Sequence, residues 1–96
     1  MKQLALTPCL RRAAERCVWF ETPDRAAGDT ARLAAYILTY GQAEDIAVLR
    51  EQLDDDDIRE ALDAAPPGIF DPRSWAYWNL VAGRFDTPPL PTRRLP

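Results

Sequence analysis

The sequence predicts an all-α fold: a compact single domain of about five short helices, followed by an extended, proline-rich C-terminal tail. Alanine, leucine, arginine and aspartate dominate the composition, which favours helix. Apolar residues recur at helical spacing, and no stretch alternates apolar and β-branched residues as a strand would. We therefore divide the 96 residues into a helical domain, residues 1–85, and a tail, residues 86–96.

The first helix is expected over about residues 8–19. Thr7 can cap its free amides, and Pro8 suits the first helical position because its missing N–H has no partner there. Trp19 and Phe20 end this helix, and we expect both rings in the core. After them, residues 22–24 predict a turn or one short helical turn. The apolar face of the first helix consists of Leu10, Ala13, Ala14, Cys17 and Val18.

The central and most buried helix is expected over about residues 32–40, because this stretch is almost entirely apolar. Asp29 or Thr30 can cap its start, and Gly41 is expected to end it in the C′ position. The next helix begins near Ala43, with two acidic residues in its first turn, where negative charge suits the helix dipole. Its inner face consists of Ile46, Leu49 and Leu53.

Four consecutive aspartates, residues 54–57, interrupt the apolar pattern before another helix. A calcium loop needs alternating acids, a central glycine and a later glutamate, and this run has none of them. We interpret the run as a solvated junction that caps the following helix, with an acidic patch for a basic partner as the alternative. The inner face of that helix consists of Ile58, Ala61, Leu62 and Ala65.

An aromatic helix is expected over about residues 72–83, after Asp71 as cap and Pro72 at its first position. Trp75 and Trp78 are three residues apart, share a face and are expected to close the core. A different face carries three residues that we predict to bind a partner: Tyr77, Leu80 and Arg84.

The tail contains four prolines in its eleven residues, which favours an extended, polyproline-like form. Segments of this kind are often spacers. However, a pre-stiffened chain with apolar and cationic side chains loses little entropy on docking. We therefore predict that the tail also contacts the partner, through Pro89, Leu90, Pro91, Arg93 and Arg94.

The composition argues against an enzyme. The chain has no histidine, which removes the commonest general base and most transition-metal sites. It has no glycine-rich phosphate loop and no nucleophile elbow. Cys9 and Cys17 would lie about 12 Å apart along one helix, too far for a disulfide, and we expect both in the core. We predict no catalytic residue, no metal site and no cofactor.

Charge and hydropathy restrict the partners. The net charge is −3, and the second half of the chain is the more acidic, which argues against a nucleic-acid partner. No apolar stretch approaches the roughly 20 residues of a membrane span, and no signal peptide is evident. We therefore expect a cytoplasmic protein that does not bind membranes.

Several motifs together resemble a known family. They are Trp19-Phe20, the helix end at residues 36–41, the Glu44-Asp45-Ile46 run with Leu49, Ile58 with Leu62, and the aromatic run at residues 74–78. Over about residues 19–80 this order resembles the small bacterial helical proteins encoded next to nucleotidyltransferase-like toxins of the AbiEii class. The resemblance implies an antitoxin-like protein that binds the toxin and blocks its nucleotide or acceptor-RNA site. It implies no catalytic residue.

Two functions follow from these observations. The first is an antitoxin-like protein that neutralises a nucleotidyltransferase-type toxin by direct contact. The alternative is a DNA-binding transcriptional regulator of its own operon, with a helix-turn-helix over about residues 43–65. The second helix of that segment holds Asp57, Glu60 and Asp63 against one arginine, Arg59, and this acidity does not suit the major groove.

Overall fold

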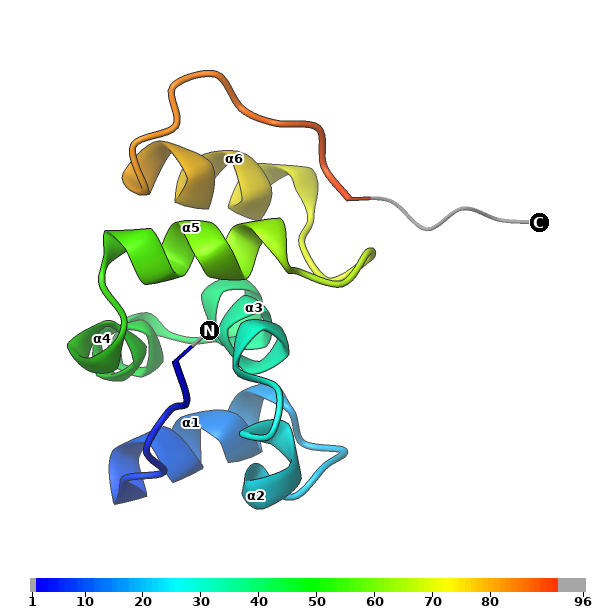
Figure 1. Cartoon of the computed structure of the whole chain (residues 1–96). Helices are drawn as coiled ribbons and strands as arrows, with labels where there is room; N and C mark the ends of the chain where they lie inside the picture. The colour runs from blue at the N-terminus through cyan, green and yellow to red at the C-terminus, as the bar shows by residue number, and fades with distance from the viewer. Residues whose placement is uncertain (1, 92–96) are drawn as a thin grey trace.

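The computed structural model describes residues 2–91, and these residues form six helices and no strand (Figure 1). The all-α prediction is confirmed. The chain forms one helix more than the five expected, because the turn predicted at Thr22 closes into a short helix. The helices are α1 (Pro8–Cys17), α2 (Pro23–Ala26), α3 (Thr30–Tyr40), α4 (Ala43–Gln52), α5 (Asp55–Asp63) and α6 (Pro72–Val81).

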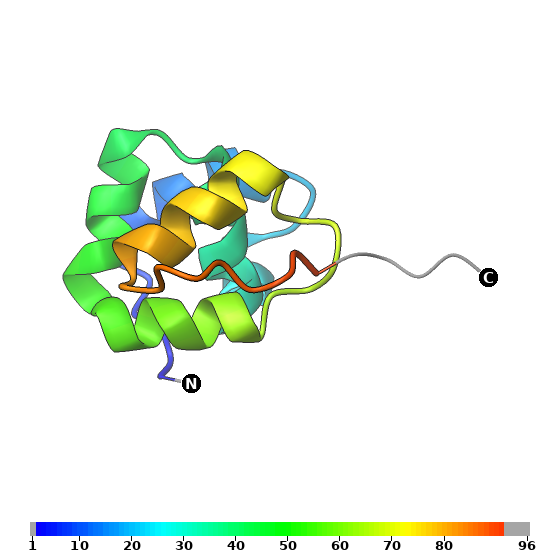
Figure 2. The same ribbon diagram turned by 90° about the horizontal axis from the view of Figure 1, so that it is seen from above.

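Helix α3 is the centre of the fold and packs against each of the other five helices. Figure 1 shows it between α1 and α2 on one side and α5 and α6 on the other, and Figure 2 shows the same layers from above. Its buried side chains extend around most of the helix, as predicted for the central element, and they are Thr30, Leu33, Ala34, Ala35, Ile37 and Leu38. Two alanines among them let neighbouring helices approach closely.

Side-chain caps begin five of the six helices. The Asp71 carboxylate accepts the Ser74 amide at 2.7 Å, and the Asp54 carboxylate accepts the Asp57 amide at 2.9 Å. The Asp57 carboxylate in turn accepts the Asp54 amide at 3.0 Å, which completes a capping box. The prediction that the four-aspartate run is a capping junction is therefore confirmed. Each cap contributes about 1 kcal/mol.

The two tryptophans of α6 are buried, as predicted, and both indole N–H groups are paired. Trp78 Nε1 donates to the Leu38 carbonyl of α3 at 2.8 Å, so it joins the last helix to the central one. Trp75 Nε1 donates to the Pro88 carbonyl at 2.7 Å, so it holds the chain that follows α6. A buried indole needs such a partner because an unpaired N–H there costs about 1–3 kcal/mol.

Three predictions about position are wrong. Helix α1 ends at Cys17 instead of residue 19, and Val18 already takes the last apolar position on its inner face. Trp19 and Phe20 therefore lie beyond the helix on the surface, with 80% and 50% of their area exposed. Cys9 is also exposed, because it lies on the outer side of α1, where its sulfur contacts the Arg12 guanidinium. Cys17 is buried as expected.

Gly41 ends α3 as predicted, but for a different reason. Its φ of −72° is open to any residue, so the left-handed conformation of a C′ glycine is not involved. The constraint is space: a Cβ at this position would lie 2.5 Å from the Ile37 carbonyl oxygen and 3.0 Å from the Asp45 Cβ. The absence of a side chain lets α4 begin directly against the end of α3.

Replacing Gly41 with alanine is predicted to destabilise the fold by about 1–3 kcal/mol, because the backbone at the α3–α4 junction must move. Urea unfolding of the wild type and the variant measures this difference. Gly28→Ala is the matched control, since its Cβ would meet the Arg25 carbonyl at a more tolerable 3.2 Å. Equal losses in the two variants would show that the close approach at Gly41 is not the cause.

Candidate functional site

An open groove of about 340 Å³ lies between the end of α1 and the outer face of α3. It exists because α1 stops at Cys17 and places Trp19 and Phe20 beside α3. Tyr36 and Tyr40 are four residues apart on α3 and therefore share the facing side. We call this the aromatic groove, and its lining residues are Arg16, Cys17, Trp19, Phe20, Tyr36 and Tyr40.

The four rings of the aromatic groove form a continuous row. Trp19 and Phe20 meet edge to face with centroids 5.7 Å apart, and Phe20 meets Tyr36 in the same way at 5.8 Å. The Tyr36 and Tyr40 centroids are 6.0 Å apart. Each such contact contributes about 0.5–1.5 kcal/mol beyond area burial. The rings therefore hold one another in place although much of their surface faces solvent.

Arg32 supports the middle of the row. Its guanidinium carbon lies 5.7 Å from the Phe20 centroid and 5.2 Å from the Tyr36 centroid, which is cation–π distance. Its Nη1 donates to Glu21 Oε2 at 2.7 Å, and this hydrogen bond raises the pKa of Arg32. The ion pair connects the segment after α1 to α3, so it fixes Phe20 relative to Tyr36.

Arg16 also lines the groove, and it joins α1 to α4. Its guanidinium donates to the buried Asp45 carboxylate and lies 3.5 Å from Glu44. Burial by itself would raise the pKa of Asp45, but hydrogen bonds from Arg16 and from the Gln42 amide lower it below its ordinary value. Asp45 was predicted only as a first-turn acid, and in the structure it is among the most buried polar residues described.

Cys17 lies at the floor of the groove as a neutral thiol. Burial, together with the nearby Asp45 charge, raises its pKa to about 11. A thiol with such a pKa is protonated at neutral pH and is a poor nucleophile. Within residues 2–91, no group of His, Cys, Asp and Glu side chains is arranged to hold a metal ion.

The charges in and beside the groove are paired. Arg16, which lines it, contacts Glu44 and Asp45, and Arg32, which supports its rings, contacts Glu21. A site for single-stranded nucleic acid combines stacked rings with a clearly cationic track. The rings are present here, and the described residues around them form no such track.

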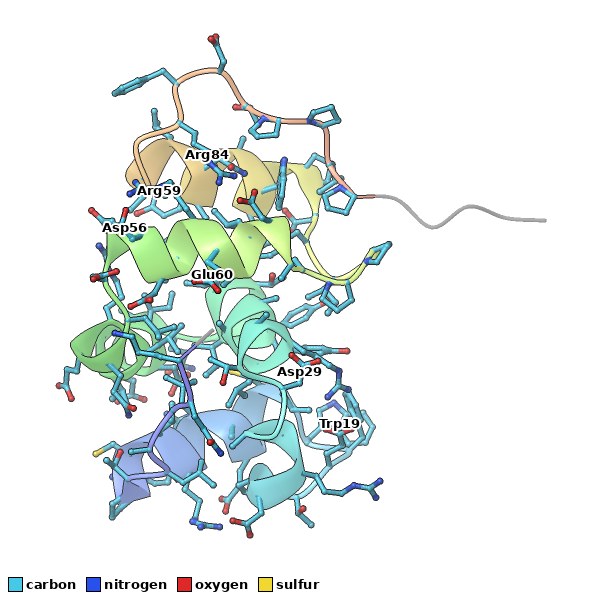
Figure 3. All side chains as sticks on the ribbon, in the orientation of Figure 1. Trp19, Asp29, Asp56, Arg59, Glu60 and Arg84 are labelled. Carbon is cyan, nitrogen blue, oxygen red and sulfur yellow. The ribbon has the colours of Figure 1, made fainter. Side chains whose placement is uncertain are left out.

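Two of the predicted partner-binding residues, Tyr77 and Leu80, are exposed on the outer side of α6, at 56% and 55%. Arg84 has a structural contact: its guanidinium donates to both Asp63 carboxylate oxygens, at 2.7 and 2.8 Å. It also lies 3.3 Å from Asn79 Oδ1. Arg84 thus fastens the segment after α6 to α5, and Figure 3 shows it above that helix.

The described part of the tail returns along α6 (Figure 1). The Pro88 carbonyl receives the Trp75 hydrogen bond, and Leu90 packs against the core. Pro89 is exposed, and Pro91 is half-buried. Arg93 and Arg94, which were also predicted to bind the partner, lie outside the described residues. The tail residues that can be placed therefore lie on the α6 side of the molecule.

Side chains of the acidic run and of the segment proposed for DNA binding form ion pairs and hydrogen bonds within the fold. Asp55 pairs with Arg50 at 2.8 Å, and Asp57 pairs with Lys2 at the same distance. Arg59 of α5 contacts Asp56 and donates to the Ala82 carbonyl beyond α6. Since α5 also packs against α3 and α6, it does not stand out as a helix that could enter a groove of DNA.

No protein-family model matches this chain, and neither a curated protein nor a solved structure is significantly similar to it. The resemblance to antitoxin-like proteins accordingly remains a prediction. Within residues 2–91, no helix is long and apolar enough to cross a membrane.

The aromatic groove was not predicted from the sequence, although one signal pointed to it. The apolar stripe of α1 is already complete at Val18, so two further large rings exceed what one helix face can bury. Their partners, Tyr36 and Tyr40, come from the helix that was expected to be the central and most buried one. Proximity between these two segments depends on the early end of α1.

Asp45→Asn is predicted to lower the free energy of unfolding by about 1–3 kcal/mol near neutral pH, because Arg16 loses a buried charged acceptor. A carboxylate with a lowered pKa in the folded state stabilises the protein above its unfolded pKa of about 3.9. This stability is lost as the pH falls through the folded pKa. Unfolding measured from neutral to acidic pH should therefore show the two proteins converging in acid. Glu44→Gln, at an exposed and longer contact, is the control and should change little.

Proposed function

We propose that this chain is a binding protein without catalytic activity, and that the aromatic groove is its main contact with a protein partner. The observation that carries this proposal is the row of four rings, of which Trp19, Phe20 and Tyr40 are exposed, Trp19 at 80%. Contiguous apolar surfaces of this kind mark interaction sites in soluble proteins. Tryptophan, tyrosine and arginine are also the residues that most often dominate binding energy.

The rigidity of the row supports this proposal. Ring-to-ring contacts and the Arg32 ion pair hold the side chains before any partner arrives. Side chains that are already ordered lose less entropy on association, which otherwise costs about 0.5–1.5 kcal/mol for each flexible one. Tyr77 and Leu80, on the outer side of α6, offer a second apolar contact.

The partner that we propose is a nucleotidyltransferase-like toxin, which this chain would neutralise by direct contact. The basis is the resemblance of its motif order to antitoxin-like proteins of the AbiEii class. Two of those motifs supply rings to the groove, Trp19-Phe20 and the Tyr36–Gly41 end of α3. A third, the Glu44-Asp45 start of α4, holds Arg16, which also lines the groove. The paired charges on α5 do not favour the alternative of a DNA-binding regulator.

Co-expression with a nucleotidyltransferase-like toxin of this class tests the proposal. The wild type should restore growth and co-purify with the toxin. Trp19→Ala and Tyr40→Ala should weaken binding about 30-fold or more, as expected for hot-spot residues that contribute about 2 kcal/mol. Phe85→Ala is the matched control, because Phe85 is 84% exposed and lies outside the groove.

Two outcomes would contradict this assignment. If the wild type neither binds the toxin nor restores growth, the antitoxin role is wrong. If binding survives both groove substitutions but is lost in Tyr77→Ala and Leu80→Ala, the contact lies on α6 instead. Trp19 is largely exposed and loses only its edge contact with Phe20, so its substitution should lower the free energy of unfolding by no more than about 1.5 kcal/mol. An unfolding curve of the variant therefore separates lost binding from lost folding.

A further inference from the structure

The aromatic groove combines apolar rings with a single charged side chain. Its lining consists of Arg16, Cys17 and the four rings, so Arg16 carries the only charge among the residues that line it. Ligand sites commonly join a largely apolar surface to a few polar groups that fix the orientation of the ligand. The hydrogen-bonding state of Arg16 therefore decides which chemistry a ligand of this groove should carry.

Arg16 keeps hydrogen-bond donors that the fold does not use. Its contacts with Asp45 and Glu44 are both made by the same nitrogen, Nη2. A guanidinium also carries N–H donors on Nε and Nη1, and within residues 2–91 these have no partner. Because the Arg16 side chain lines the groove and is 46% exposed, a ligand there can reach these donors.

A second arginine lies one turn earlier on α1. Arg12 and Arg16 together line a smaller neighbouring pocket of about 90 Å³, with Cys9, Glu44 and Val48. The Arg12 guanidinium contacts the Cys9 sulfur at 3.3 Å and forms no ion pair with a carboxylate of residues 2–91. A ligand that extends from the rings past Arg16 therefore meets another guanidinium with unused donors.

We propose that the aromatic groove binds a segment of the protein partner in which a large apolar residue lies next to an aspartate or glutamate. The apolar side chain packs on the rings, and the carboxylate accepts hydrogen bonds from the unused donors of Arg16. This inference rests on the proposed function, and it specifies the chemistry of the partner at the same site.

The two carboxylates of the fold hold Arg16 in place for this contact. Asp45 is buried and remains on Nη2, which orients the guanidinium before a partner arrives. Glu44 is 67% exposed and lies 3.5 Å away, so its contact with Arg16 is weak and can be given up. Both carboxylates screen the charge of Arg16, and the bound segment therefore gains chiefly from short, charge-assisted hydrogen bonds.

A nucleic acid also combines flat rings with negative charge, but the surroundings of Arg16 favour a carboxylate. A strand presents successive phosphates and needs a cationic groove that follows its backbone. Here Glu44 and Asp45 share the one guanidinium of the lining, so they repel an extended run of phosphates. A single carboxylate needs only the two parallel donors that one guanidinium offers.

The experiment uses the intact chain and synthetic peptides with blocked ends, so that side chains carry the only carboxylates. In the first peptide, glutamate alternates with leucine and phenylalanine, and in a matched peptide each glutamate is glutamine. Isothermal titration calorimetry should show that the glutamate peptide binds about tenfold or more tightly at low salt. Added salt should reduce this difference, because an exposed ion pair is screened.

Variants of the chain locate the contact. Glu44→Gln should tighten binding of the glutamate peptide about threefold and leave the glutamine peptide unchanged, because a competing carboxylate is removed. Trp19→Ala should weaken both peptides about tenfold or more. Arg73→Gln is the control for Arg16, since Arg73 is exposed on α6 outside the groove, and it should change neither affinity.

Arg16→Lys keeps a cation for Asp45 but loses the planar fork, so it should remove most of the preference for glutamate. If this variant does not fold, the increase expected in Glu44→Gln still tests the contact. Equal affinities for the two peptides, or no binding of either at millimolar concentration, would overturn the proposal. So would a thymidine oligonucleotide that binds more tightly than the glutamate peptide and loses its affinity in Trp19→Ala.

These measurements require no toxin. If the toxin binds through Trp19 but the wild-type chain does not distinguish glutamate from glutamine, the proposed function stands and this inference is wrong. If the chain selects the glutamate peptide but does not bind the toxin, the inference stands and the toxin is not the partner. If both hold, the glutamate peptide should compete with the toxin for the wild-type chain.

Discussion

The longest helix in residues 2–91 has 11 residues, and helices of this length are marginal on their own in water. The whole structure therefore depends on burial against α3, the one helix that contacts all the others. Burying a leucine or isoleucine side chain contributes about 1.5–3 kcal/mol, and α3 supplies Leu33, Ile37 and Leu38 to this core. The caps set where the helices begin, but packing on α3 decides whether they persist.

The same constraint explains why one part of α3 is not covered. Helix α1 stops at Cys17, and α2 has only four residues, so neither reaches the side of α3 that carries Tyr36 and Tyr40. Trp19 and Phe20 partly cover that side with ring edges instead of a helix. The aromatic groove is thus the place where the packing of short helices around a central one is incomplete, and its rings are held by one another and by Arg32.

The local part of this fold could be predicted from the sequence, and the non-local part could not. Caps such as Asp71 and Asp54 act within four residues, so composition and spacing reveal them. The helix faces that meet the core, such as the one with Ile58 and Leu62, can be predicted from the helical spacing of their apolar residues. The pairing of Arg84 with Asp63, 21 residues away, and of Arg16 with Asp45, 29 residues away, depends on which helices become neighbours. The exposure of Trp19 could not be predicted either, because the hydrophobicity of a residue does not show whether it lies in the core or in an exposed apolar surface.

Electrostatics then limits what this surface can recognise. Most of the arginines in the described helices have a carboxylate partner within the fold, as Arg16, Arg32, Arg50 and Arg59 do. Charges paired in this way fix the geometry of the chain but project little field toward a ligand, so long-range steering of a nucleic acid is weak. In the proposed function, recognition at the groove therefore rests on ring shape and short-range contact, which an aromatic or proline-rich protein segment can supply.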